Sequence, residues 1–132
     1  MRLVADSHAI VWFTSGSPRL SETARTALRE AQREHVLAVS VATFLDLWYV
    51  TQTTRQVTPD QLAELRQTLT TSPAVDLRPV DVAVADAFAS INRAAIADPW
   101  DRLIVATALA LAVPVVTRDQ AIQESWVVET IW

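Results

Sequence analysis

The chain has 132 residues, 51% of them hydrophobic, and a formal net charge of −4 at pH 7, so we expect one globular domain over residues 1–132. No apolar run is long enough to cross a bilayer and the N-terminus does not resemble a signal peptide, which predicts a cytoplasmic protein with no membrane partner. The absence of cysteine excludes disulfides, zinc–thiolate sites and a cysteine nucleophile, and with only two histidines a bound metal would need oxygen ligands, which favours Mg²⁺ or Mn²⁺.

Short apolar segments alternate with helical segments along the whole chain. We expect strands at residues 2–5, 36–39, 74–77, 114–117 and 127–131. We expect helices at residues 9–13, 22–34, 41–53, 58–69, 81–95 and 120–124, and another that begins at residue 98 and contains the apolar run 103–113. This alternation predicts an α/β fold of three layers, in which helices cover both faces of a five-stranded parallel sheet. Gly16 is the sole glycine, so no glycine-rich phosphate loop exists and a dinucleotide or NTP site is not expected.

Four aspartates stand where strands end or helices begin. Asp6 ends the first strand and Asp119 follows the fourth, and ligands of open α/β sheets bind beyond the carboxyl ends of the strands. Asp98 and Asp101 lie on nearly the same face at the start of one helix. Each of these acids could equally cap a helix or complement its dipole, so the positions alone leave both interpretations open.

Asp46 is the most informative acid, because it lies in the apolar stretch 41–50 with no polar stripe around it. An unpaired carboxylate there would cost several kcal/mol or shift its pKa. No arginine is within helical reach, so we expect the side chain to face a cation or a metal. The alternative is a partly exposed acid at the edge of the sheet.

Carboxylates gathered at one place stay ionised together only with a hard cation between them. Mg²⁺ held in this way activates water and stabilises an in-line displacement at phosphorus. Ser7 and Thr117 could hydrogen-bond ligands or the water around a metal, or could simply cap helices and turns. Arg102 and Arg118 could hold substrate phosphates or balance the acids, or could form ordinary salt bridges.

The charge pattern leaves the partner open. A net charge of −4 argues mildly against a general nucleic-acid binder, although a clustered acidic site would account for part of it. All eleven basic residues are arginine, which binds phosphate bidentately and stacks on bases. The five tryptophans could stack on bases, but we expect them in the core or in a dimer interface, and we expect His8 to be a helix-start residue.

Taken together, the motifs resemble those of PIN-domain ribonucleases, and specifically the VapC-like toxins of bacterial type II toxin–antitoxin systems. The resemblance runs nearly end to end and rests on Val4-Ala5-Asp6-Ser7-His8, on Val39-Ser40 followed by Asp46, on Asp98-Pro99-Trp100-Asp101-Arg102 with the apolar residues after it, and on Val116-Thr117-Arg118-Asp119. It implies strand order 3-2-1-4-5 and Mg²⁺- or Mn²⁺-dependent cleavage of single-stranded regions of RNA. It also implies homodimers and inhibition by a cognate VapB-like antitoxin.

Carried over by position, the resemblance assigns a role to each acid. The acids that match the catalytic quartet of the family are Asp6, Asp46, Asp101 and Asp119. Asp6 and Asp101 would be the principal metal ligands, with Asp119 and the additional Asp98 supporting them. Asp46 would orient the attacking water or bind a second ion.

Two departures from the family pattern bear on activity. The second acid is usually Glu, and Asp46 is one methylene shorter, so its contact with a metal would run through water. A His-Arg pair often precedes the DPxD motif, whereas this chain has Ile96-Ala97. The shortened Asp46 is the one support for an alternative in which a catalytically weakened PIN-like protein acts mainly by binding its antitoxin.

A further alternative is a Mg²⁺-dependent phosphotransfer domain. A receiver domain needs a lysine near the sheet, and this chain has none. A phosphatase of the aspartyl-phosphate kind needs Asp-x-Asp after the first strand, where this chain has His8.

If the protein is a toxin that an antitoxin inhibits, we expect the antitoxin to place an apolar helix in a groove near residues 41–53 and an arginine beside the acids.

Overall fold

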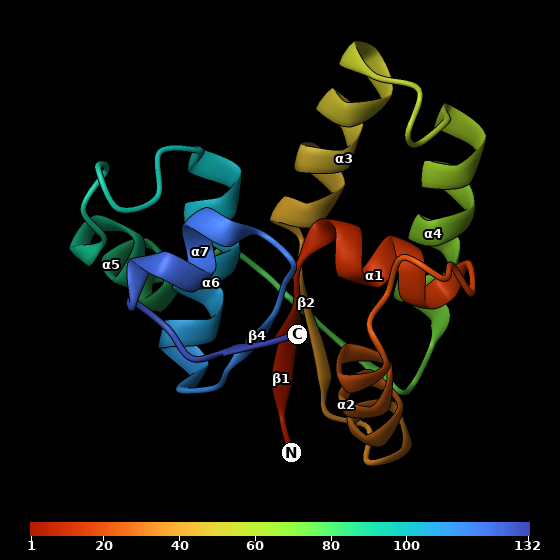
Figure 1. Cartoon of the computed structure of the whole chain (residues 1–132), viewed down its shortest axis with the longest axis horizontal. Coiled ribbons are helices and arrows are strands. Elements are labelled where there is room, and N and C mark those ends of the chain that lie inside the picture. Colours follow the sequence, from red (N-terminus) through yellow and green to blue (C-terminus); the bar gives the residue numbers. More distant parts are fainter.

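The computed structural model describes all of residues 1–132 as five strands and seven helices (Figure 1). The strands are β1 (Leu3–Ala5), β2 (Leu37–Ser40), β3 (Val75–Arg78), β4 (Val115–Val116) and β5 (Thr130–Ile131). The helices are α1 (Ser7–Thr14), α2 (Glu22–Arg33), α3 (Ala42–Thr53), α4 (Pro59–Thr71), α5 (Val82–Ser90), α6 (Pro99–Leu111) and α7 (Gln120–Ser125). All neighbouring strands pair in parallel, in the order β3-β2-β1-β4-β5, which confirms the predicted fold class and strand order.

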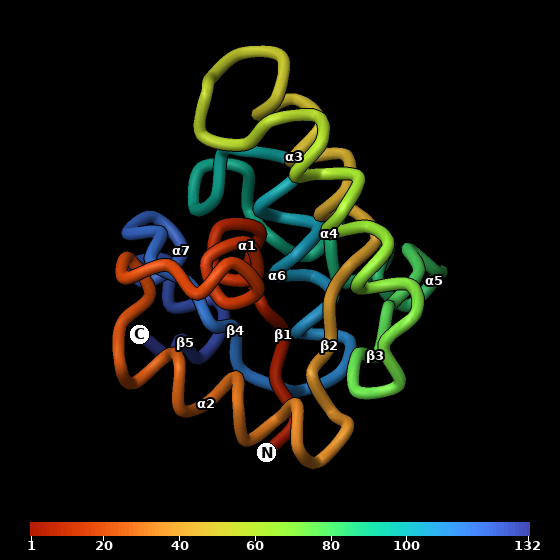
Figure 2. The backbone as a smooth tube through the Cα atoms, turned by 90° about the vertical axis from the view of Figure 1, so that its right-hand side faces the viewer, coloured from red at the N-terminus to blue at the C-terminus, as the bar shows by residue number.

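Helices cover both faces of this sheet. Helices α1, α2 and α4 lie on one face, nearest the viewer in Figure 2, and α5 and α6 lie on the other (Figures 1 and 2). Because side chains alternate along a strand, Leu3 and Ala5 of β1 join the core under α2, whereas Val4 packs against Ile104 and Ala108 of α6. Burial on both faces explains why the central strands β1 and β4 are continuously apolar, whereas the edge strand β3 carries Asp76 and Arg78.

None of the helices is long and apolar enough to span a membrane.

Several predicted boundaries were wrong, three of them for clear local reasons. Helix α1 begins at Ser7 rather than residue 9, because the Asp6 carboxylate already accepts a hydrogen bond from the Ser7 amide. Helix α5 ends at Ser90 rather than residue 95, where Ile91 turns into an extended conformation and the Asn92 side chain accepts from the Ala94 amide. The last strand contains only Thr130–Ile131, the two residues that pair with β4.

The chain uses residues other than glycine where helices end in the left-handed region. Ala112, the C-cap of α6, has φ of 55°, although glycine is the residue that adopts this conformation without a steric cost. We expect Ala112→Gly to raise the free energy of unfolding by about 0.5–1 kcal/mol, measured by urea denaturation. The control is Ala63→Gly, at a solvent-exposed position in the middle of α4. This change should lower the free energy of unfolding by a similar amount. A loss of stability in both variants would contradict the prediction.

Candidate active site

Five aspartates from separate parts of the chain line one pocket at the carboxyl ends of the central strands. The pocket has a volume of about 420 Å³. Its ten lining residues are Asp6, His8, Trp12, Arg19, Asp46, Gln56, Asp98, Asp101, Arg118 and Asp119. The structure therefore brings together all five acids that the sequence singled out, from the end of β1, from α3, from the start of α6 and from the segment after β4.

Two hydroxyl groups hold the deepest acids in place. Asp6 is only 6% exposed, and its two carboxylate oxygens accept hydrogen bonds from the Ser7 amide and from Thr117 Oγ1, each at 2.7 Å. Ser7 Oγ in turn donates to Asp46 Oδ2 at 2.6 Å. The Thr117 hydroxyl also accepts from the Asp119 amide at 2.9 Å. Ser7 and Thr117 thus link acids that are far apart in the sequence.

Asp98 and Asp119 line the pocket and cap helices at the same time. Asp98 Oδ1 accepts from the amides of Trp100 and Asp101 at 2.8 and 3.1 Å, at the start of α6. Asp119 Oδ1 accepts from the Ile122 amide at 2.9 Å, at the start of α7. The second oxygen of each carboxylate has no hydrogen bond within the chain, so capping leaves one oxygen free for a ligand.

Asp101 differs from the other acids because its carboxylate accepts no hydrogen bond within the chain. Burial, together with the charges of the other four pocket acids, raises its pKa from 3.8 to about 8. Burial also raises the pKa of Asp6 and of Asp46, against the hydrogen bonds from Thr117 and Ser7. The pocket therefore holds more carboxylate charge than this environment tolerates without a cation.

The donor atoms fit a hard cation, whereas the side-chain positions do not yet form a metal site. No group of three or more of these side chains is arranged so that it could hold a metal ion as it stands. All the candidate ligands are carboxylate oxygens, which suit Mg²⁺ and Mn²⁺, and the free oxygens of Asp98, Asp101 and Asp119 are available.

The two arginines named from the sequence lie in different places. Arg118 lines the pocket, and its guanidinium lies 5.7 Å from the centre of the Trp12 ring. Arg102 is buried and does not line the pocket, because one residue along a helix turns the side chain by about 100° away from Asp101. Its guanidinium lies 4.9 Å from the Phe88 ring centre and donates to the Ala97 carbonyl, so the structure does not place it beside a substrate or the acids.

Sequence reasoning missed four residues that line the pocket. His8 does lie in the first turn of α1, as expected, but it also faces the pocket, 3.1 Å from Gln56 Oε1 and with its ring centre 5.5 Å from that of Trp12. The four-residue spacing between His8 and Trp12 was a usable signal, because it places both on one face of a helix. Arg19 and Gln56 lie in loops, where no periodicity indicates which way a side chain points.

The hydroxyl of Thr117 has a measurable role in this arrangement. We expect Thr117→Val to lower the free energy of unfolding by about 1.5–3 kcal/mol, because the buried Asp6 carboxylate loses the hydrogen bond from Thr117 Oγ1. Thr107→Val is the matched control, since this buried hydroxyl donates only to the Leu103 carbonyl. Equal and small effects of the two changes in thermal or urea unfolding would contradict the assigned role.

Comparison with known proteins identifies relatives of this fold. The PIN domain family model matches residues 3–125. No curated protein has a recognisably similar sequence. VapBC2 from Rickettsia felis, solved bound to a DNA fragment from its promoter, has a TM-score of 0.69 at 12% identity, covering 98% of this chain and 97% of that one.

Two further solved structures share the fold at low identity. FitAcB from Neisseria gonorrhoeae has a TM-score of 0.65 at 21% identity, covering 97% of this chain and 95% of that one. VapBC-5 from Mycobacterium tuberculosis, a member of the VapBC family of toxin–antitoxin systems, has a TM-score of 0.59 at 22% identity and covers 98% of both chains. The similarity extends over the full length in each case.

Proposed function

Because this chain belongs to the PIN-domain family, we propose that its acidic pocket is the active site of a Mg²⁺- or Mn²⁺-dependent endoribonuclease that cleaves single-stranded regions of RNA. PIN domains are generally nucleases, which supports the reaction class. The observation that carries the proposal is the convergence of five carboxylates on one pocket, where burial and the charges of the other four acids raise the pKa of Asp101 to about 8. Such crowding is relieved by a divalent cation, the cofactor that phosphodiester hydrolysis of this kind needs.

Each acid has a distinct part in the proposed reaction. When bound, Mg²⁺ or Mn²⁺ supplies Lewis acidity at the scissile phosphate and activates water. Asp6 and Asp101 would be its principal ligands, with Asp98 and Asp119 supporting. Asp46 would orient the attacking water, with its own position fixed by the hydrogen bond from Ser7.

Substrate binding would depend on groups at the edge of the acidic pocket. Arg118 lines the pocket and takes part in no ion pair within the chain, so its guanidinium is available to a substrate phosphate. Arg102 would have a structural role under α5, where it packs against Phe88.

We also propose that the protein is the toxin of a type II toxin–antitoxin pair in the cytoplasm. The full-length likeness to VapBC complexes supports a VapB-like antitoxin as the partner. An apolar helix of the antitoxin would lie near α3 and place an arginine beside the acids. The second candidate is a catalytically weakened protein that acts mainly by binding the antitoxin, and the one observation in its favour is the short side chain of Asp46.

The direct test is digestion of a single-stranded RNA by the purified protein. We expect cleavage with Mg²⁺ or Mn²⁺, loss of cleavage in EDTA, and recovery when the ion is added in excess. A double-stranded RNA of the same sequence is the control and should resist. If no RNA in a random-sequence pool is cut with either ion while the antitoxin still binds, the nuclease proposal fails and the binding-only candidate replaces it.

We propose that the protein forms homodimers through an apolar patch on α3, because exposed aromatic residues are typical of interface centres. The patch comprises Leu45, Trp48 and Tyr49, which are 52%, 50% and 48% exposed, together with Trp100, whose ring centre lies 5.7 Å from that of Tyr49.

Trp48→Glu should weaken self-association by roughly 30-fold or more, measured by light scattering across a concentration series. Trp126→Glu is the control, since Trp126 is 91% exposed and lies outside the patch. A Trp48→Glu protein that still dimerises, but no longer binds the antitoxin, would assign the patch to the antitoxin instead.

A further inference from the structure

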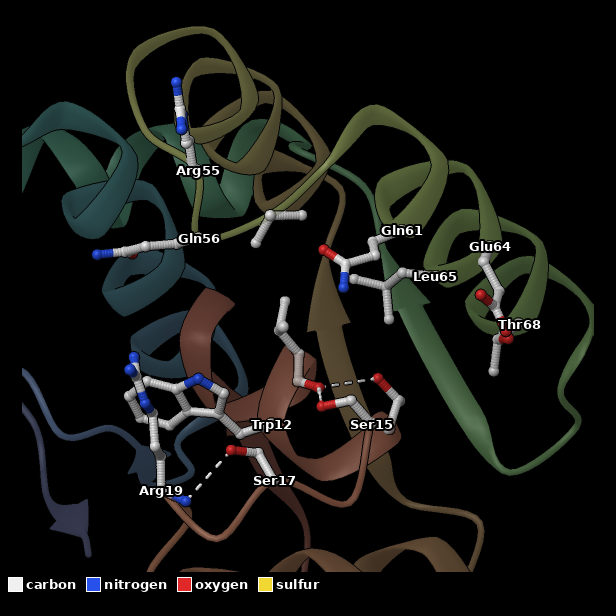
Figure 3. Close-up of a pocket in the computed structure, with 13 residues that line it drawn as sticks. Trp12, Ser15, Ser17, Arg19, Arg55, Gln56, Gln61, Glu64, Leu65 and Thr68 are labelled. Atoms are coloured by element: carbon white, nitrogen blue, oxygen red, sulfur yellow. Dashed lines mark hydrogen bonds between the residues drawn. The ribbon is translucent and has the colours of Figure 1, made fainter.

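A second cavity adjoins the acidic pocket and shares a wall with it. This α1–α4 cavity lies between α1, the loop after α3 and α4, and has a volume of about 660 Å³ (Figure 3). Trp12, Arg19 and Gln56 line both the cavity and the acidic pocket. A molecule that occupies the acidic pocket can therefore extend past these three side chains into the cavity.

Most of the residues that line the cavity are polar, and its floor is apolar. Four of its thirteen residues are hydrophobic, and two of these, Val57 and Leu65, are buried. Hydroxyl and amide side chains make up much of the wall, and the Gln61 amide points into the space beside Leu65 (Figure 3). Flat apolar contact combined with hydrogen-bonding edges suits a nucleobase better than the apolar face of a protein helix.

Charge around the cavity is opposite to that of the acidic pocket. Arg19 and Arg55 line the cavity, both exposed, and Glu64 is its only acid. Neither arginine takes part in an ion pair within the chain. Arg55 stands at the rim with its guanidinium turned outward, on the loop opposite Trp12 and Arg19 (Figure 3). Unpaired arginines along a polar cavity are the groups that phosphates of a nucleic acid strand would contact.

We propose that the α1–α4 cavity binds a nucleotide of single-stranded RNA that lies next to the scissile phosphate. Trp12 stacks on a base at the junction of the two pockets, Arg19 contacts the phosphate that joins them, and Arg55 contacts the following phosphate. This inference rests on the proposed function, since it identifies where the substrate of that reaction continues. It assigns Trp12, Arg19 and Arg55 as positioning residues for the RNA strand.

The test measures binding without cleavage, using a fluorescein-labelled single-stranded RNA of eight nucleotides and the full chain in EDTA. We expect Trp12→Ala to weaken binding roughly 5- to 100-fold and Trp12→Phe to retain most of it, because stacking needs an aromatic face. We expect Arg55→Ala to weaken binding several-fold and to lower the slope of log K against log salt by about one. Arg66→Ala is the control, because Arg66 is exposed on α4 but lines neither pocket, and it should bind as the unmodified protein does.

The outcomes separate this inference from the nuclease proposal. If Arg55→Ala and both Trp12 variants bind the RNA as tightly as the Arg66→Ala control, the inference is overturned. If they instead weaken only the binding of the antitoxin, the cavity is a protein site and the inference is again overturned. RNA binding that depends on Trp12 and Arg55 in a protein that cuts no RNA would support the cavity while refuting the nuclease. Normal KM values for RNA cleavage in all the variants would support the nuclease while refuting the cavity as an RNA site.

Discussion

Replacing Asp101 by asparagine is expected to abolish RNA cleavage while it stabilises the metal-free protein. Loss of a group that only supports a metal ligand costs roughly 10- to 100-fold in activity, so loss of a proposed principal ligand should cost more. The same change removes the carboxylate whose pKa burial and four neighbouring acids raise to about 8. Because asparagine has the same shape and no charge, the free energy of unfolding at pH 8 should rise by about 2 kcal/mol, after allowance for the solvent screening of this partly exposed group.

This prediction is specific because RNA cleavage should fall while the free energy of unfolding rises. A merely structural residue would lose activity and stability together. Asp86→Asn is the control, since Asp86 is exposed on α5 and lies outside the pocket, and it should change neither quantity measurably. Unchanged cleavage by Asp101→Asn would remove Asp101 from the active site, and a loss of stability would contradict the electrostatic description of the pocket.

The unmodified protein in EDTA is expected to lose stability as the pH rises from 5 to 8. An acid with a raised pKa in the folded state binds more protons when folded than when unfolded, between its unfolded value near 3.8 and its folded value of about 8. Stability therefore falls as the pH rises through this window, and the raised pKa values of Asp6 and Asp46 act in the same direction. We expect a loss of about 2 kcal/mol, measured by urea unfolding at each pH.

A divalent cation should reverse this loss. At pH 8, Mn²⁺ at about 100 times its dissociation constant would add about 2.7 kcal/mol to the free energy of unfolding. Asp101→Asn should flatten the pH dependence and weaken the response to Mn²⁺. A pH profile that is flat in EDTA, or stability that Mn²⁺ leaves unchanged at pH 8, would show that the acids are not coupled as the structure indicates.

The sequence predicted the elements of the fold because its patterns are local. Each apolar strand segment and each capping residue is visible within a few positions, and all five strands and seven helices were located, with errors at boundaries such as Ser90. The order of the strands came from the resemblance to a family, since spacing along the chain does not determine which strands pair. Asp46 was identified because an acid in an apolar helix is expensive unless something at a distance compensates for it.

Side-chain direction was the part that the sequence could not supply. Arg102 follows Asp101 directly and was expected near the acids, but the helix turns it toward Phe88. Arg19 and Gln56 come from loops, so their place in the pocket depends on how α1 and α4 pack. The hydroxyl bridges from Ser7 and Thr117 join residues 39 and 111 positions apart, and no local pattern indicates such pairings.

Three of the pocket acids also have a structural role, because Asp6, Asp98 and Asp119 are the N-caps of helices α1, α6 and α7. A descendant that lost the proposed RNA cleavage would still be selected to keep these three, since replacing any of them would destabilise the fold. Their presence in a related chain is therefore poor evidence of an active enzyme. Asp101 caps nothing and is costly to the fold, so it is the residue that a lineage would discard first once catalysis no longer mattered.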